Sequence, residues 1–368
     1  MQYIDEFRNP VAIGKLLARI RSRSSRGVRL MEFCGGHTHA ILKFGLRRLL
    51  PPTIELLSGP GCPVCVTSQR DLDTAMALAM TDGVILTTFG DMIRVPGTKG
   101  NLQEIKALGG DVRIVYSSLD ALTMARANPG RQVVFLAVGF ETTAPTVAAA
   151  ILSARAEGLA NFSVLSLHKL TPPAMKAILD AGEVKLAGIL GPGHVTTIIG
   201  SRAWEFLPAC HAIPCAVAGF EPLDILEGIY ALVDMIESGT PRVRNAYARS
   251  VRPEGNLEAQ RRMQQVFEVE EAQWRGLGPV PSSGLGLRKG FESFDALLRF
   301  PVELDASPEP KGCRCGEVLR GVVQPPACAL FGRVCTPENP VGPCMVSGEG
   351  ACGAHWLYRE DRMLEGTG

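Results

Sequence analysis

Cysteine is the residue type in this chain with the clearest chemical potential, because six of its 11 cysteines lie between residues 313 and 352. Four thiolates suit either a tetrahedral zinc ion or an iron–sulfur cluster. Apart from the very tight Cys313/Cys315, the segment lacks the close pairs of a structural zinc site, so its spacing favours a cubane cluster. Zinc and free thiols are the alternatives. Only one of Cys313 and Cys315 is expected to bind, and Cys344 is the other spare. The six candidates for four places are Cys313, Cys315, Cys328, Cys335, Cys344 and Cys352.

A second constellation is the Cys-x-x-Cys formed by Cys62 and Cys65, which follows a Gly-Pro-Gly string between an expected strand and an expected helix. At a helix N-terminus the thiolate is stabilised, and such a pair can cycle through a disulfide. The alternative is a buried pair of small apolar residues, because free cysteines often belong to cores. The Gly-Pro-Gly entry and Pro63 favour an exposed turn with a function.

Cys34, His37 and His39 share six residues at the end of the first expected strand, with two glycines that allow a backbone or ligand to approach. The Cys34 thiolate is a soft ligand that suits low-spin iron or another thiophilic metal. His37 or His39 could accept its proton or bind metal. The alternative is a helix capped by Thr38, with incidental histidines.

Polar residues follow several other expected strands. Taken singly, a solvated carboxylate is the usual explanation for each acidic one. Taken together, they stand at strand ends, where doubly wound sheets build their sites. They are Asp91 and Arg94, Glu141 and Thr142, His194, and Glu221.

The elements that must position these residues alternate between apolar strands and helix-like segments, which indicates parallel sheets covered on both faces. Strands are expected at 28–33, 53–57, 84–88, 112–116, 133–138, 162–167, 184–190 and 213–218. Helices are expected at 10–24, 68–80, 101–108, 119–127, 143–156 and 196–206. A charged helix at 257–274 and a Gly/Pro/Ser-rich stretch at 276–290 follow.

A weak internal repeat favours two similar α/β lobes that face one another. The string at 55–64 resembles that at 188–197, and 137–142 resembles 216–222. The alternative is that strand–turn–helix joints converge on such strings independently.

Composition and missing motifs argue against several classes of protein. The net charge is +1, from 38 basic and 37 acidic residues, so no global field favours nucleic acid or an anionic membrane. No 18-residue apolar stretch or signal peptide is found, so we expect a cytoplasmic protein with reduced thiols. The absence of a phosphate loop, a dinucleotide fingerprint and H-E-x-x-H disfavours ATP hydrolysis, nicotinamide chemistry and metalloprotease activity.

Over residues 5–358 the sequence resembles the HypD family of hydrogenase maturation factors. The resemblance is carried by FCGGHTHA, GPGCPVC, TFGDMIRVPGT, GFETTAP, GPGHV, GFEP and the terminal CRCGEVLRG…CTPENPVGPCMVSGEGAC. It implies two similar Rossmann-like lobes with parallel sheets around a central cleft, and a C-terminal [4Fe–4S] domain. We expect the lobes at 1–120 and 121–240, and a helical linker with the cluster domain at 241–368.

The resemblance also implies a role in assembling the Fe(CN)₂CO group of [NiFe]-hydrogenases. The partners it implies are a HypC-type chaperone and a HypE-type cyanide donor. It assigns iron binding to Cys34 and redox activity to Cys62 and Cys65. Its cluster ligands fall on Cys315, Cys328, Cys335 and Cys352, with Cys313 as the rival for the first place.

We predict that His37 orients or deprotonates Cys34, and that Asp91, Glu141 and His194 complete the cofactor site.

Two hypotheses compete with the role in hydrogenase maturation. The first competitor is an iron–sulfur-linked thiol–disulfide oxidoreductase that acts on a protein disulfide, with Cys34 as a resolving thiol. The second is a zinc-stapled binding protein. Whether the chain is an enzyme by itself, or acts only within a maturation complex, is also open.

Overall fold

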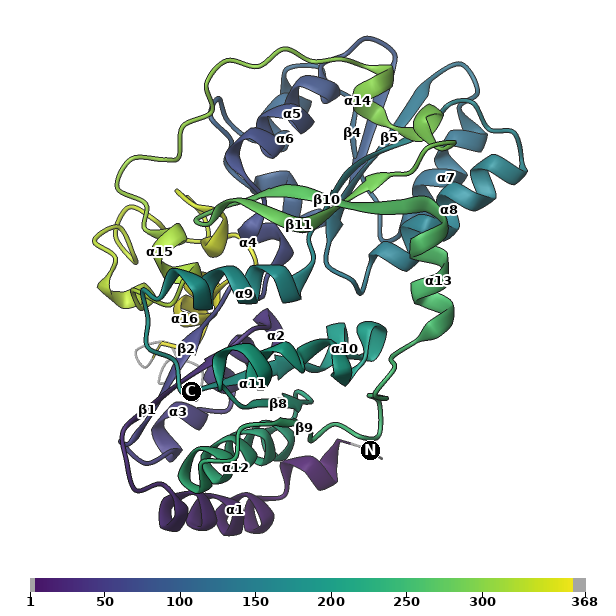
Figure 1. Ribbon diagram of the computed structural model, residues 1–368. Coiled ribbons are helices and arrows are strands. Elements are labelled where there is room, and N and C mark those ends of the chain that lie inside the picture. The colour runs from purple at the N-terminus through teal and green to yellow at the C-terminus, as the bar shows by residue number, and fades with distance from the viewer. Residues whose placement is uncertain (1–3, 360–368) are drawn as a thin grey trace.

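The structure is a computed structural model that describes residues 4–359, and parallel sheets form the centres of its two lobes (Figure 1). The strands are β1 (Val28–Glu32), β2 (Ile54–Ser58), β3 (Val84–Thr88), β4 (Val112–Ile114), β5 (Gln132–Gly139), β6 (Phe162–His168), β7 (Gly188–Pro192), β8 (Cys215–Ala218), β9 (Val243–Asn245), β10 (Phe267–Trp274) and β11 (Gly278–Leu287). The first sheet has the order β2-β1-β7-β8-β9 and the second β4-β3-β5-β6, and neighbouring strands in both are parallel. The predicted Rossmann-like fold class is confirmed.

Helices cover both faces of the first sheet, with α1 and α12 packed together on one side (Figure 1). The longer helices are α1 (Pro10–Arg23), α2 (Gly35–Lys43), α5 (Gln69–Ala79), α7 (Ser118–Ala127), α8 (Ala144–Ala156), α9 (Thr171–Ala181), α12 (Pro222–Ser238) and α13 (Leu257–Val266). The shorter ones are α3 (Leu46–Leu49), α4 (Pro63–Val66), α6 (Leu102–Ala107), α10 (Gly193–Ile199), α11 (Phe206–His211), α14 (Ala296–Arg299), α15 (Cys315–Leu319) and α16 (Ala351–Leu357). Local sequence explains several starts: Asn9 caps α1 ahead of Pro10, and Ser68 and Ser117 open capping boxes.

The sheets divide the chain differently from the expected boundaries at 120 and 240. The first lobe combines β1 and β2 with β7, β8 and β9, whereas the second takes the contiguous strands β3 to β6. The reason is that β7 pairs with β1, with Leu30 opposite Gly188, and not with β6, which precedes it in the chain. Both Gly-Pro-Gly turns of the internal repeat therefore end strands of the same sheet, on either side of β1.

The segment from 257 to 290 was predicted wrongly. In place of one charged helix over 257–274, α13 ends at Val266 and β10 begins at the next residue. The Gly-rich stretch forms β11, which pairs with β10 as an antiparallel hairpin. Gly276 and Gly278 adopt φ values of +78° and +74° at the hairpin tip, where a side chain would be strained. The expected helix at 196–206 is likewise interrupted, at Gly200 with φ of +84°.

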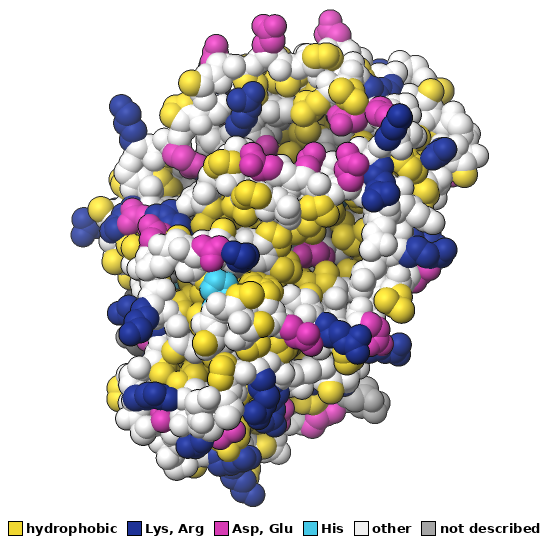
Figure 2. Space-filling view, in the orientation of Figure 1, with side chains coloured by type: hydrophobic (Ala, Val, Ile, Leu, Met, Phe, Trp, Pro, Cys, Tyr) yellow, Lys and Arg dark blue, Asp and Glu magenta, His cyan; other side chains and the backbone are white. Residues whose placement is uncertain are grey.

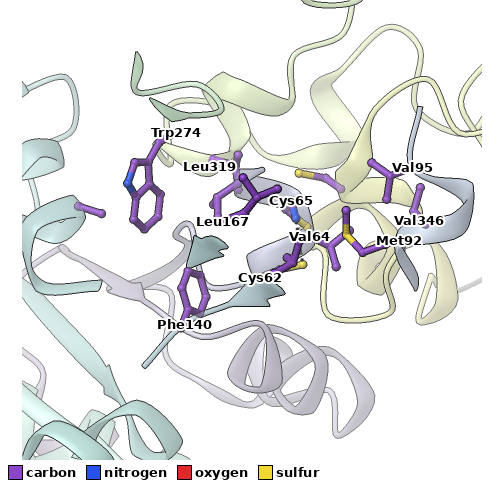
Figure 3. Close-up of a cluster of buried hydrophobic side chains, with 14 of the residues drawn as sticks. Cys62, Val64, Cys65, Met92, Val95, Phe140, Leu167, Trp274, Leu319 and Val346 are labelled. Atoms are coloured by element: carbon purple, nitrogen blue, oxygen red, sulfur yellow. Dashed lines mark hydrogen bonds between the residues drawn. The ribbon is translucent and has the colours of Figure 1, made fainter. Parts of the chain in front are cut away.

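Three hydrophobic clusters fill the interior, and one of them joins all parts of the molecule. One cluster belongs to the first lobe and one lies in the second. The third contains the Cys-x-x-Cys residues Cys62 and Cys65, side chains of both sheets, and four C-terminal cysteines. Figure 3 shows this cluster, with Trp274 of the hairpin on one side and Val346 on the other. The dithiol and the cysteine-rich segment therefore share one core.

Replacing Ile229 with Ala should destabilise the first lobe, because Ile229 of α12 is fully buried in its cluster. The truncation should lower the free energy of unfolding by about 2 to 5 kcal/mol. Denaturant unfolding measures it. The control is Val11→Ala on α1, since Val11 is 68% exposed, and its effect should stay within about 0.5 kcal/mol.

Candidate metal and thiol site

Cys34 stands where β1 ends and α2 begins, and the loop that carries the dithiol packs directly onto it. A Cβ atom added to Gly61 would lie 2.3 Å from the Cα atom of Cys34. The Gly35 N–H donates a hydrogen bond of 2.9 Å to the Gly61 carbonyl oxygen. Only glycine fits this contact. The turns that follow β1 and β2 are therefore interlocked, and Cys34 lies beside the start of the Cys-x-x-Cys.

Glu32 is a buried carboxyl beneath this turn that the sequence analysis did not identify. It is 1% exposed, and the Cys34 N–H donates to its Oε2 atom over 3.1 Å. The Thr38 hydroxyl donates to its other oxygen, so Thr38 does not cap α2, which begins after Cys34. Burial raises the pKa of Glu32 to about 7. The available signal was an acidic residue at the end of a strand whose preceding residues Leu30 and Met31 are apolar.

Cys34 is a half-buried residue, and its surroundings hold its thiol in the protonated form. Burial and the neighbouring carboxyls of Glu349 and Glu32 raise its pKa to about 12. Glu349 comes from the C-terminal segment, and its carbonyl oxygen would lie 2.5 Å from a Cβ atom on Gly35. The C-terminal segment therefore covers the Cys34 turn.

His37 is fully buried and lies against the turn that follows β8. Its Nε2–H donates to the Gly219 carbonyl oxygen over 2.9 Å, and the Ala218 oxygen is 3.3 Å away. These acceptors fix the tautomer and leave a lone pair on Nδ1, which has no hydrogen-bond partner among the described residues. Burial lowers the pKa of His37 to about 4. No hydrogen bond from its ring to Cys34 is found among the described residues, so its predicted role toward that thiol stays a prediction.

Phe220 brings His37 and His194 together, although 157 sequence positions separate them. The His37 ring stacks on Phe220 at 4.7 Å between ring centroids, and the His194 ring stacks on it at 3.9 Å. Burial lowers the pKa of His194. Two neutral imidazoles therefore lie at the carboxyl ends of strands in the first sheet. The GFEP motif had been noted for Glu221, whereas its Phe220 makes these contacts.

The Cys-x-x-Cys forms the start of α4, with Cys62 as its N-cap. The Cys65 N–H donates to the Cys62 Sγ atom over 3.3 Å. Both side chains are buried, at 3% and 0% exposure, so the expectation of an exposed turn is wrong. The reason is that Gly61 packs under Cys34 while Val346 and Leu319 of the C-terminal segment belong to the same core (Figure 3). Burial raises the pKa of Cys65.

A cavity of about 640 Å³ opens between the lobes beside these residues. Cys62, His39, Asp91 and Glu349 contribute to its lining, together with Gly36 next to Cys34. Asp91 lies where it was predicted, at a strand end, and accepts a hydrogen bond of 2.9 Å from the Ser347 hydroxyl of the C-terminal segment.

Glu141 takes a different position from the cavity residues. Its carboxylate accepts hydrogen bonds from the Thr171 N–H (2.8 Å) and hydroxyl (3.1 Å) at the start of α9. Burial raises its pKa to about 7. The structure therefore gives Glu141 a helix-capping contact, and Glu141 is not among the residues that line the cavity.

On the face shown in Figure 2, acidic and basic side chains are interspersed, with acidic ones gathered over the β10–β11 hairpin.

The C-terminal cysteines surround a small enclosed space. Five of the six line it, and only Cys344 does not; the five are Cys313, Cys315, Cys328, Cys335 and Cys352. Over residues 4–359 no three His, Cys, Asp or Glu side chains are arranged as ligands of a single metal ion. Cys313 and Cys315, the two candidates for the first ligand position, both line the space. The structure therefore does not decide which of them is the ligand.

Cys344, expected to be a spare, connects the two groups of thiols. Its thiol lies within hydrogen-bonding reach of Cys65 on one side and of Cys315 on the other. Cys315 in turn contacts Cys313 and Cys352. The thiols therefore form a continuous series from Cys62 at the cavity to the enclosed cysteine space. No sequence pattern pairs Cys344 with Cys65, because 278 residues separate them.

A comparison with family models decides the assignment. The HypD model, described as "Hydrogenase formation hypA family", matches residues 11–359. The chain belongs to the HypD family of hydrogenase maturation factors. It is 47% identical to the hydrogenase maturation factor HypD of Rhizobium leguminosarum bv. viciae, over 97% of this chain and 96% of that protein. It is also 47% identical to HypD of Azotobacter vinelandii (99% and 98% covered) and 44% identical to HypD of Escherichia coli K12 (98% and 99%).

Between residues 4 and 359, no helix combines the length and the apolar character that a bilayer crossing requires.

Replacing Glu349 with Gln should make Cys34 more reactive. The change removes a negative charge that raises the pKa of the Cys34 thiol, so the pKa falls and the thiolate fraction at pH 8 rises. Iodoacetamide labelling followed by peptide mass spectrometry should show several-fold faster alkylation of Cys34. The exposed Cys210 is the internal reference, and equal rates at Cys34 in both proteins would contradict the electrostatic assignment.

Proposed function

We propose that this chain is a redox-active scaffold on which the Fe(CN)₂CO group of [NiFe]-hydrogenases is assembled. In this proposal Cys34 holds the iron and Cys62/Cys65 act as a redox dithiol, in complex with a HypC-type chaperone. The observation that carries it is the interlock of Gly61 with Cys34, which sets Cys34 beside the start of the Cys-x-x-Cys, whose Cys62 lines the cavity. Family membership supports the role in hydrogenase maturation.

The iron enters as cargo, and Cys34 is the residue suited to hold it. Cyanide and CO stabilise low-spin Fe(II), and a thiolate is a matching soft ligand. Because the pKa of Cys34 is raised to about 12, the thiol must lose its proton as iron binds. The free lone pair on His37 Nδ1 supplies either a second ligand or a hydrogen-bond acceptor near this site. His194 and Asp91 remain proposed contributors, whereas the contact of Glu141 with Thr171 supports a structural role for it.

The dithiol supplies a two-electron couple next to the cargo. Oxidation of Cys62 and Cys65 forms one S–S bond and releases two protons and two electrons. The Cys65 N–H aimed at Cys62 Sγ favours Cys62 as the nucleophilic sulfur, because it lines the cavity while Cys65 is fully buried. The contact of Cys65 with Cys344 gives the buried sulfur a second thiol neighbour.

The cysteine-rich segment fits an iron–sulfur cluster by the chemistry of its donors, since five thiols face one enclosed space. The proposed ligands are Cys315, Cys328, Cys335 and Cys352, with Cys313 competing with Cys315. A [4Fe–4S] cluster bound there would accept and supply single electrons. Because Cys315 also contacts Cys344, it stands at the junction between the ligand set and the dithiol.

The partners in this proposal are a HypC-type chaperone and a HypE-type cyanide donor. The cavity of about 640 Å³ has room for part of a small partner as well as diatomic ligands. The proposal assumes a cytoplasmic setting, where thiols are kept reduced.

A second candidate is an iron–sulfur-linked thiol–disulfide oxidoreductase that reduces a protein disulfide. The continuous series of thiols from Cys62 to Cys315 favours it. The burial of Cys62, at 3% exposure, weighs against it, because a protein disulfide must reach the attacking sulfur. Reduction of insulin by the purified protein with an electron donor would favour this candidate.

Infrared spectroscopy of the anaerobic protein, co-produced with its chaperone and the cyanide-donating factors, tests the scaffold directly. Cyanide and CO stretching bands should appear in the wild type and vanish in Cys34→Ala, while the absorbance of the cluster stays. Cys210→Ala is the matched control, since Cys210 is exposed and outside the site. Bands that persist in Cys34→Ala would contradict the assignment of Cys34 as the iron ligand.

Single replacements distinguish the two candidates for the first cluster ligand. If Cys315 is the ligand, Cys315→Ser should lose most of its iron and acid-labile sulfide, and Cys313→Ser should keep them. The reverse result would assign the place to Cys313 and leave Cys315 to pair with Cys344. Zinc at one per chain in the wild type, without sulfide, would contradict the cluster altogether.

A further inference from the structure

Arg275 is a buried charge that is not among the proposed ligands, although its positive charge partly opposes the rise in the pKa of Cys313. It is 1% exposed and sits at the tip of the β10–β11 hairpin, directly after Trp274. Arginine is almost never fully buried unless its donors are paired, because removing a charge from water is costly. The contacts of its guanidinium therefore indicate what it does.

Three separate acceptors surround the Arg275 guanidinium. Its Nε–H donates to the Thr67 carbonyl oxygen over 3.0 Å, and its Nη2 donates to the Gln69 side-chain oxygen over 2.9 Å. The Nη1 atom pairs with the carboxylate of Glu309, and the backbone N–H of Arg275 donates to the Val66 carbonyl oxygen over 2.9 Å. Val66 is the last residue of α4, so Arg275 satisfies the carbonyl end of the helix that begins at Cys62.

The hairpin tip also contacts the cysteine-rich segment. Gly276 packs against Gly316 of α15, where an added Cβ atom would lie 2.4 Å from the Gly316 Cα atom. Arg320 Nη1 donates to the Gly276 carbonyl oxygen over 2.5 Å. In Figure 3 the Trp274 side chain lies in the same core as Cys65 and Leu319. The tip is therefore wedged between the dithiol helix and the segment that carries the other cysteines.

We propose that Arg275 is a positioning residue for the Cys62/Cys65 couple, whose guanidinium fixes the end of α4 and favours the dithiol over the disulfide. The inference rests on the proposed redox function of this pair. A four-residue helix has too few internal hydrogen bonds to hold its own geometry, so a tertiary anchor must do so. The anchored geometry keeps the hydrogen bond from the Cys65 N–H to the Cys62 Sγ atom. A disulfide instead requires the two sulfur atoms to approach to a bond length of about 2.05 Å.

The anchoring depends on the shape of arginine as well as on its charge. The planar guanidinium serves acceptors in three directions at once, which a lysine ammonium on a flexible chain cannot do. Arg275→Lys keeps the positive charge but loses the planar guanidinium, so it separates the contribution of charge from that of shape. The inference expects Arg275→Lys to behave like Arg275→Met.

The test is the equilibrium of the full-length anaerobic protein with mixtures of glutathione and glutathione disulfide. Glutathione disulfide accepts the two electrons and two protons of the Cys62/Cys65 pair and is reduced to two glutathione molecules. Alkylation of the remaining thiols and mass spectrometry of the Cys62–Cys65 peptide give the ratio of disulfide to dithiol. At equal glutathione poise, Arg275→Met and Arg275→Lys should raise this ratio about tenfold, which corresponds to a potential about 30 mV lower.

Two further variants keep the test decisive. Arg288→Met is the matched control, because Arg288 lies at the other end of the same hairpin and donates to the Phe267 carbonyl oxygen. Its ratio should equal that of the wild type. Glu309→Gln changes one half-exposed acceptor of Arg275 and should raise the ratio of disulfide to dithiol by less than the Arg275 variants do. If Arg275→Met does not fold, this variant still tests the positioning role.

The outcomes separate this inference from the proposed function. A wild-type pair that forms no disulfide at any glutathione ratio would overturn the redox function, and the inference with it. A wild-type pair that cycles, with unchanged ratios in folded Arg275→Lys and Glu309→Gln, would overturn the inference alone. A raised ratio in Arg275→Lys, with an unchanged ratio in Arg288→Met, would establish the positioning role.

Discussion

The contact between Gly61 and the backbone of Cys34 is the constraint on which the site depends. Two parallel strands of one sheet end side by side, and their turns fit together only because residue 61 has no side chain. This contact places Cys34 beside the loop that leads to Cys62. It also buries Glu32 beneath the turn, where its carboxylate holds the Cys34 N–H. The placement of a soft thiol beside the start of the Cys-x-x-Cys follows from this packing.

Burial controls the chemistry of nearly every group in the site. It raises the pKa of Cys34 to about 12 and that of Glu32 to about 7, and it lowers that of His37 to about 4. All three shifts favour the uncharged form. A divalent metal ion would reverse this preference, since its charge stabilises a thiolate.

The sequence revealed the local features well, because they depend on nearby residues. Strand β3 was predicted to the residue, and the Cys34 turn, the Cys62 turn and Asp91 stand at strand ends as expected. What it did not reveal depends on residues far apart in the chain. The lobes are discontinuous because β7 pairs with β1, and the hairpin was missed because charged residues on β10 resemble an exposed helix.

The same explanation covers the functional residues that were missed. Phe220 joins His37 to His194, and Cys344 joins Cys65 to Cys315, through contacts that no spacing encodes. Thiol pairs so distant in sequence can be identified only once the C-terminal segment is seen to fold back over the first lobe.

We propose that iron held by Cys34 and the Cys62/Cys65 couple influence one another, because Cys34 lies beside the start of the Cys-x-x-Cys. The measurement that tests it most directly is the infrared spectrum of the iron-loaded protein while the pair is switched between dithiol and disulfide. The cyanide and CO bands should shift reversibly with the redox state of the pair, and the shift should be lost in a Cys62→Ser/Cys65→Ser double variant. Bands that stay at the same frequencies in both redox states would contradict it.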